Sequence, residues 1–171
     1  MKFSVFTVMT PEYSLAEIVK ILSRLGYDGV EWRVQHVDTS YANEGPSYWR
    51  DNRCTIELET ILEHAEEIRD LSIAAGLEIC ALSSYLLPHE RERIEHVVQA
   101  AQIMGAPQVR ITAPRYDRVR SYRDLFRETR AQLSRLQEMS RAYGVKIVVE
   151  THHRTIIPSA SSAYRLVEGM E

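Results

Sequence analysis

Polar side chains that could carry acid–base or metal chemistry stand at the end of a buried strand-like run. In the segment KIVVETHH, the alternating residues Val145, Ile147 and Val149 are apolar, which places Glu150 and His152 on the opposite face. A carboxylate that ends a buried valine run is costly unless it is paired or bound to a cation. Carboxylate oxygen and imidazole nitrogen are ligands of divalent metal ions, so Glu150 is the leading candidate for a metal site.

Two structural alternatives explain the same pattern. An ion pair between Glu150 and Arg110, on neighbouring strands, would also balance the buried carboxylate. His152 follows the end of the strand, where histidines often occupy surface loops, and the adjacent His153 fits such a loop better still. These alternatives stay open at the level of the sequence.

The same alternation predicts that other polar residues face the inside of a barrel. On the segment 77–83 it places Cys80, Leu82 and the following Ser84 inward. The carboxyl ends of parallel strands carry the functional groups of such folds. The predicted mouth is lined by Glu31, Arg33, Ser84, Arg110, Thr112, Glu150 and His152.

A repeated unit positions these residues. Four times a segment with helical periodicity ends at a glycine and is followed by a β-branched run. Gly26, Gly76, Gly105 and Gly144 each stand where a helix needs a left-handed C-terminal residue. Ser14 and Glu17 have the spacing of a capping box at the start of the first helix.

The repeat predicts five βα units in one α/β domain. We expect strands at 2–9, 28–34, 77–83, 107–112 and 145–150, and helices at 14–25, 57–75, 90–104, 121–143 and 159–169. This alternation requires a parallel sheet. No glycine-rich phosphate loop follows a strand, which disfavours the open nucleotide-binding folds and favours an incomplete TIM barrel.

Composition places the chain among ordinary globular proteins. It has 171 residues, 44% hydrophobic and 26% charged, with a net charge of −3. These values exclude disordered and collagen-like classes, and they disfavour general attraction to nucleic acid or to anionic membranes. Two unrelated cysteines and no membrane-length apolar run lead us to expect a cytoplasmic protein.

The segments GYDGVEWR and VKIVVETHH, with the inward Arg110 between them, resemble the xylose isomerase-like TIM-barrel family, the sugar phosphate isomerase/epimerase superfamily. The resemblance covers all five βα units. It implies that Glu150 is a ligand of a divalent metal (Mn, Mg, Zn or Co) and a catalytic base, and that His152 contacts a substrate hydroxyl. It also implies a small sugar or sugar phosphate as substrate. We expect Arg110, Glu31 and Arg33, which line the predicted mouth, to bind it together with Trp49.

Five units are fewer than the eight of a TIM barrel, which needs about 250 residues. We therefore expect residues 1–171 to form a single domain equivalent to the N-terminal part of such an isomerase. The family's later metal ligands and second base have no counterpart in this sequence. A sheet of five strands leaves an unpaired edge, so we also expect the chain to form homo-oligomers.

Three functions compete. The first is metal-assisted isomerisation or epimerisation of a small sugar or polyol, inactive in this short chain. The second is DNA repair of the endonuclease IV kind, suggested by the arginines between residues 110 and 130. The third is a non-catalytic barrel remnant that self-associates.

One long loop joins the second strand to the second helix. Residues 35–53 contain Tyr41, Tyr48 and Trp49, and Gly45-Pro46 marks a turn. Trp49 and Tyr48 are predicted to form an apolar wall over a sugar ring. Simple packing over the barrel rim explains them equally well.

Overall fold

The computed structural model describes residues 1–170. The strands are β1 Ser4–Phe6, β2 Gly29–Gln35, β3 Thr55–Glu57, β4 Glu78–Ser84, β5 Gln108–Thr112 and β6 Lys146–Glu150. The α-helices are α1 Leu15–Arg24, α2 Ile61–Ala74, α3 Arg91–Met104, α4 Tyr122–Tyr143 and α5 Ala160–Val167. Two short 3-10 helices, η1 Thr7–Met9 and η2 Thr39–Tyr41, follow β1 and β2.

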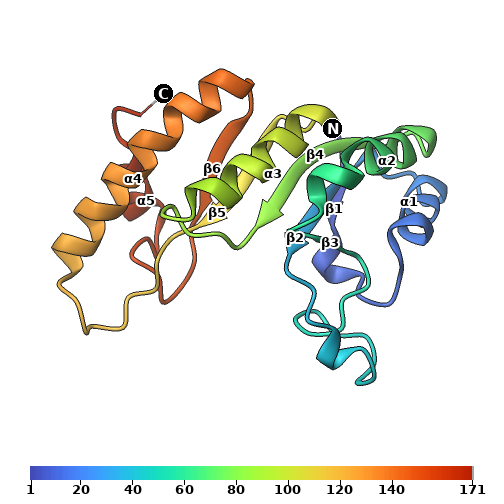
Figure 1. Ribbon diagram of the computed structural model, residues 1–171, viewed down its shortest axis with the longest axis horizontal. Helices are drawn as coiled ribbons and strands as arrows, with labels where there is room; N and C mark the ends of the chain where they lie inside the picture. Colours follow the sequence, from blue (N-terminus) through green and yellow to red (C-terminus); the bar gives the residue numbers. More distant parts are fainter. Residues whose placement is uncertain (171) are drawn as a thin grey trace.

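The strands form one parallel sheet in the order β1-β2-β4-β5-β6. Figure 1 shows this sheet as an open arc with the helices on its outer side, and the loops that follow β2, β5 and β6 all hang from its lower edge. This arrangement is part of a TIM barrel, as the repeat predicted. The lower edge therefore carries the carboxyl ends of the strands, where functional groups gather in this class of fold.

The five predicted βα units are confirmed, with two corrections. The first strand ends at Phe6, because residues 7–9 form the 3-10 helix η1. The second helix begins at Ile61 rather than at residue 57, because Thr55–Glu57 forms the additional strand β3 beside β2. β1 pairs with residues 29–31 of β2 and β3 with residues 33–35, so β3 continues the sheet past the end of β1.

Local signals at the helix ends are present as predicted. The Ser14 side chain accepts a hydrogen bond from the Glu17 amide, and the Glu17 side chain accepts one from Ser14, which completes the capping box. Gly105 and Gly144 end α3 and α4 in the left-handed conformation, with φ of 72° and 66°. These ends fix where each chain segment turns back into the sheet.

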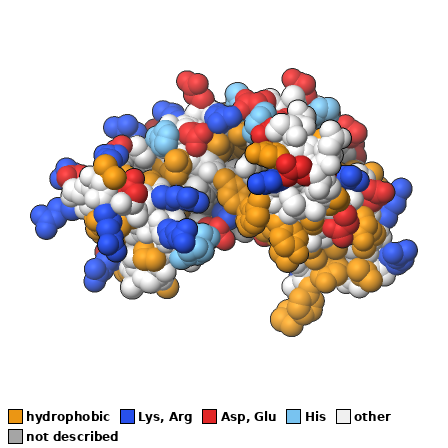
Figure 2. Space-filling view, turned by 90° about the horizontal axis from the view of Figure 1, so that it is seen from below, with side chains coloured by type: hydrophobic (Ala, Val, Ile, Leu, Met, Phe, Trp, Pro, Cys, Tyr) orange, Lys and Arg blue, Asp and Glu red, His pale blue; other side chains and the backbone are white. Residues whose placement is uncertain are grey.

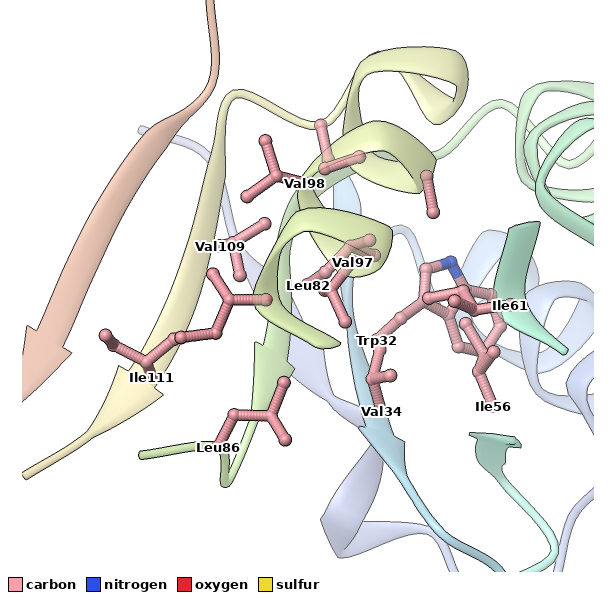
Figure 3. Close-up of a cluster of buried hydrophobic side chains, with 14 of the residues drawn as sticks. Trp32, Val34, Ile56, Ile61, Leu82, Leu86, Val97, Val98, Val109 and Ile111 are labelled. Atoms are coloured by element: carbon pink, nitrogen blue, oxygen red, sulfur yellow. The ribbon is translucent and has the colours of Figure 1, made fainter. Parts of the chain in front are cut away.

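The core lies between the sheet and the helices (Figure 3). Trp32 and Val34 of β2 and Val109 and Ile111 of β5 are fully buried on the helix-facing side. The Trp32 indole Nε1 donates a hydrogen bond to Ser72 Oγ on α2 at 3.3 Å. Apolar residues therefore occupy the predicted outward positions of both strands, which leaves their polar residues on the inner face.

A cavity opens at the free edge of β6. It has a volume of about 430 Å³ and is lined mainly by apolar residues of α4, β6 and α5, including Leu133, Ile147, Val149, Tyr164 and Val167. Within residues 1–170, β6 pairs with β5 alone. Unpaired strand edges beside apolar surface recruit further strands.

We predict that the purified chain self-associates through this edge. A second copy is the expected partner, because β1 and β6 leave free edges at opposite ends of one parallel sheet and strands of two copies can pair there. Tyr164→Lys, at an exposed position beside the cavity, should weaken association in sedimentation at micromolar concentration, whereas Ile73→Lys, exposed on α2, should leave it unchanged. A compact monomer at all concentrations would contradict this prediction.

The two cysteines are free thiols, and Cys54 is fully buried next to β3. Burial raises the pKa of the Cys54 thiol from 9.0 to about 11. The folded chain therefore keeps a proton that the unfolded chain releases above about pH 9. This contribution to stability is fully present below pH 9.0 and is lost as the pH rises to about 11.

We predict that the free energy of unfolding decreases more steeply with pH in the wild type than in Cys54→Ala. The extra loss should be about 1–3 kcal/mol between about pH 8 and about pH 10.5, measured by urea unfolding. The same pH dependence in both proteins would show that the Cys54 thiol does not titrate as described.

The part of the chain that the structure describes contains no helix long and apolar enough to span a membrane.

Candidate active site

Strand register brings residues distant in sequence into one row on the inner face of the sheet. Arg33 of β2 lies opposite Ser83 of β4, Ser83 lies opposite Arg110 of β5, and Arg110 lies opposite Val148 of β6. Paired residues of neighbouring strands point to the same side, so two arginines lie on the inner face, separated by one strand. Glu31 lies on the same face, and its Oε1 accepts a hydrogen bond from the Ser83 hydroxyl.

A β-bulge in β4 corrects one part of the predicted mouth. Val30 lies opposite Ile79 but Glu31 lies opposite Ala81, so Cys80 is an extra residue in β4. The extra residue reverses the alternation from Ala81 onward. Ser83 is therefore the inward residue, whereas Leu82 and Ser84, predicted to face inward, lie on the helix side with Trp32 and Val34.

Arg110 and Glu150 form an ion pair on the inner face. The Arg110 guanidinium donates to Glu150 Oε2, and Arg110 is almost fully buried while the Glu150 side chain is 46% exposed. Two aromatic rings flank the guanidinium carbon, Phe6 at 5.4 Å and Tyr85 at 4.8 Å from the ring centroids. Both contacts stabilise a cation that has lost most of its water. The structure thus contains the Arg110–Glu150 pair that the sequence left as an alternative.

Arg33 is the more deeply buried of the two arginines, with 3% of its surface exposed. Its Nη1 donates to Thr55 Oγ1 at 2.7 Å, its Nη2 donates to Gln35 Oε1, and Tyr85 lies 5.6 Å from its guanidinium carbon. Burial lowers the pKa of the Arg33 guanidinium from its ordinary value, and the neighbouring Tyr85 acts in the opposite direction. One tyrosine ring therefore contacts both buried arginines.

The long loop after β2 closes a pocket over Arg33. The pocket has a volume of about 290 Å³ and is lined by Arg33, Gln35, Tyr41, Trp49, Arg50, Asn52 and Thr55, among others. Trp49 is 67% exposed and meets the edge of Tyr85, with ring centroids 6.3 Å apart. Trp49 thus reaches the mouth, while Tyr48 is exposed and does not line the pocket. Figure 2 views the molecule from below Figure 1, the side on which the loops after β2, β5 and β6 lie. The surface is hollowed between the half that holds α4 and the half that holds β1 and β2, and basic side chains are prominent on the α4 half.

His152 lies beyond β6 on the exposed surface. Its ring stacks on His153, with centroids 4.1 Å apart, and its Nδ1 lies 2.7 Å from the His153 carbonyl oxygen. Within residues 1–170 no hydrogen bond or ring contact connects His152 to Glu150. Its expected contact with a substrate hydroxyl stays a prediction.

Sequence reasoning missed Tyr85, Phe6, Thr55 and Ser83 as parts of the mouth. Tyr85 directly follows β4, a position at which the carboxyl-end rule could have selected it. Ser83 was hidden by the bulge, and Thr55 was missed because no strand was predicted between the loop 35–53 and the helix 57–75. Phe6 ends the short strand β1, which the sequence did not distinguish from the turn that follows.

Three of the arginines after β5 form contacts on the outer surface. Arg120 pairs with Glu128 and Arg127 pairs with Asp124 at 2.7 Å. Arg130 donates to the backbone carbonyls of Arg165 and Leu166 near the end of α5. These contacts fit a solvated helix face on which Arg130 anchors the end of α5.

Residues 19–171 match the model of the family described as xylose isomerase-like TIM barrel. The chain belongs to the xylose isomerase-like TIM barrel family. No curated protein sequence matches it.

Several solved structures have a fold similar to that of this chain. 3-Keto-D-glucoside 4-epimerase YcjR from E. coli is 16% identical with a TM-score of 0.72, and the match covers 98% of this chain and 63% of that one. The IolI protein with a bound zinc atom is 16% identical with a TM-score of 0.68, covering 98% and 58%. L-Ribulose 3-epimerase is 16% identical with a TM-score of 0.67, covering 98% and 57%. The chain thus spans about six-tenths of the length of these structures.

The described residues do not by themselves fit a divalent metal. Within residues 1–170 no three His, Cys, Asp or Glu side chains are close enough to hold an ion. Protein sites for zinc have about four ligands and those for calcium or magnesium about six or more. Glu150, the predicted ligand, is held by Arg110 instead.

We predict that Glu150→Gln destabilises the chain by about 1–2 kcal/mol, because it leaves the buried Arg110 guanidinium without its carboxylate. The estimate is below that for a fully buried pair, since the Glu150 side chain is half exposed. Urea unfolding measures the difference. Glu128→Gln, which removes the exposed pair with Arg120, is the matched control and should cost less than about 0.5 kcal/mol. Equal effects of the two substitutions would contradict the role given to the Arg110–Glu150 pair.

Proposed function

We propose that this chain binds a small sugar or polyol at the mouth of the sheet, and that the protein it represents isomerises or epimerises that ligand by moving a proton. The observation that supports this most is the pocket of about 290 Å³ at the carboxyl end of β2, which combines an aromatic wall with buried hydrogen-bonding groups. Sugars are recognised by such combinations, because their C–H faces pack on aromatic rings while their hydroxyls need fixed polar partners. The family membership and the names of the neighbouring epimerases support the same ligand class.

Each residue of the mouth has a proposed task. Trp49 packs against the ring of the sugar, and Arg33 donates hydrogen bonds to its oxygens. Arg110 orients the Glu150 carboxylate, which is the proposed proton acceptor because it is the half-exposed acid at the end of β6. Glu31 holds Ser83 and is proposed as a further polar contact.

The Arg110–Glu150 pair also favours a second candidate, a non-catalytic barrel half that binds its ligand without converting it. The Glu150 carboxylate already accepts a hydrogen bond from the Arg110 guanidinium, so part of its acceptor capacity is occupied. Proton abstraction next to a carbonyl further needs a group that stabilises the developing oxyanion. The described residues bring no metal site to this position. A metal, if the protein uses one, therefore needs ligands in addition to Glu150.

We predict that the purified chain binds sugars but does not turn them over. Proton transfer at carbon incorporates deuterium in D2O, so sugars and sugar phosphates incubated with the chain should show no exchange by NMR. Exchange that disappears in Glu150→Gln and persists in Glu128→Gln would contradict this prediction and identify Glu150 as a base in this chain. Binding is followed by the emission of the exposed Trp49, and Trp49→Phe should abolish the response while the buried Trp32 stays as an internal reference.

A further inference from the structure

Arg33 is a buried cation whose partners are all neutral. Its guanidinium donates to the Thr55 hydroxyl and the Gln35 amide oxygen, and its Nε has no hydrogen-bond partner. Within residues 1–170 it forms no ion pair with an Asp or Glu, whereas the neighbouring Arg110 pairs with Glu150. Burying a charge without an opposite charge is costly, because the lost hydration is not replaced. The charge of Arg33 would therefore be stabilised by an anion bound beside it.

The other basic side chains of the pocket each have an acidic partner. Arg50 pairs with Glu44 at 2.7 Å and lies over the Tyr41 ring. His36 lies 3.5 Å from Glu57. Asp38, the acid that lines this pocket, is exposed, accepts the Ser40 amide in a local turn and, within residues 1–170, forms no ion pair with Arg33. Arg33 is thus the buried cation of this pocket whose charge an incoming anion would balance.

The position of Arg33 defines where such an anion would bind. It lies on the inner face of β2 and lines the pocket together with Thr55, Tyr41 and Trp49. An anionic group bound beside Arg33 leaves the aromatic side chains of the loop to contact the carbon part of the ligand. A planar guanidinium suits both carboxylate and phosphate oxygens.

We propose that this pocket binds the anionic group, a carboxylate or a phosphate, of a small sugar-derived ligand, with Arg33 as its counter-ion. The proposal rests on the proposed sugar-binding function and narrows it to sugar acids and sugar phosphates. Neutral sugars would leave the Arg33 charge uncompensated and so bind more weakly.

The test compares D-glucose, D-gluconate, D-glucose 6-phosphate and inorganic phosphate on the purified chain at equal ionic strength. Affinity is measured from Trp49 emission, and binding is checked by the shift in melting temperature. We expect the two sugar anions to bind about tenfold or more tighter than glucose. A preference between gluconate and glucose 6-phosphate distinguishes a carboxylate site from a phosphate site.

Three variants separate the role of Arg33 from general effects. Arg33→Gln should reduce the preference for anions to about twofold or less, while Arg33→Lys, which keeps the charge but not the planar fork, should keep part of it. Arg120→Gln, which removes a cation outside the pocket that pairs with Glu128, is the matched control and should keep the full preference. If Arg33→Gln does not fold, Arg33→Lys and Arg120→Gln still provide the comparison.

The outcomes distinguish this inference from the function on which it rests. Glucose binding as tightly as its anionic derivatives would overturn the inference and leave sugar binding intact. Arg33-dependent stabilisation by phosphate or gluconate, with no response to any neutral sugar, would support the anion site and count against the proposed binding of neutral polyols. An anion preference unchanged in both Arg33 variants, or no response to any anion, would also overturn the inference.

Discussion

Two guanidinium groups on the inner face of the sheet have lost most of their contact with water, and the remaining polar side chains of the mouth are arranged around this positive charge. Arg110 is compensated by Glu150 and by the faces of Phe6 and Tyr85. Among residues 1–170, Arg33 is contacted only by neutral oxygens and by the same tyrosine ring. Because a buried cation is stable only where its surroundings replace its hydration, the identities of the neighbouring side chains are closely constrained.

This constraint explains why residues from five strands and from the loop after β4 must be placed accurately. Parallel pairing provides the accuracy, since it fixes which residues of adjacent strands share a face. At the start of β2, a side chain in place of Gly29 would meet the Glu78 carbonyl oxygen at 2.7 Å, so the close approach of β2 and β4 depends on glycine. A shift at this point would displace Arg33 relative to Ser83 and Arg110, and with them the shared contact to Tyr85.

The sequence predicted the βα units well because their signals are local. Helical periodicity, the Ser14–Glu17 capping box and the glycines after the helices depend only on neighbouring residues. It predicted the inward position of Arg33, Arg110 and Glu150 for the same reason, since alternation along a regular strand is a local rule. It failed where the outcome depends on distant contacts. β3 exists through pairing with β2, and the bulge at Cys80 is a property of two strands. The pairing of Arg110 with Glu150 is also tertiary, and the sequence could offer it only as one of two alternatives.

The bulge at Cys80 divides β4 into two stretches. Before the bulge, Ile79 lies opposite Val30; after it, the alternation of inward and outward residues along β4 is shifted by one, so that Ala81 lies opposite Glu31. Deleting one residue here would not simply shorten the strand. It would exchange the faces of all residues that follow, turning Leu82 toward the mouth and Ser83 toward the helices. A one-residue insertion at this point changes which side chains line the binding site, while the residues of β4 before the bulge keep their positions. Two chains that differ by one residue here would therefore present different ligand contacts on the same fold.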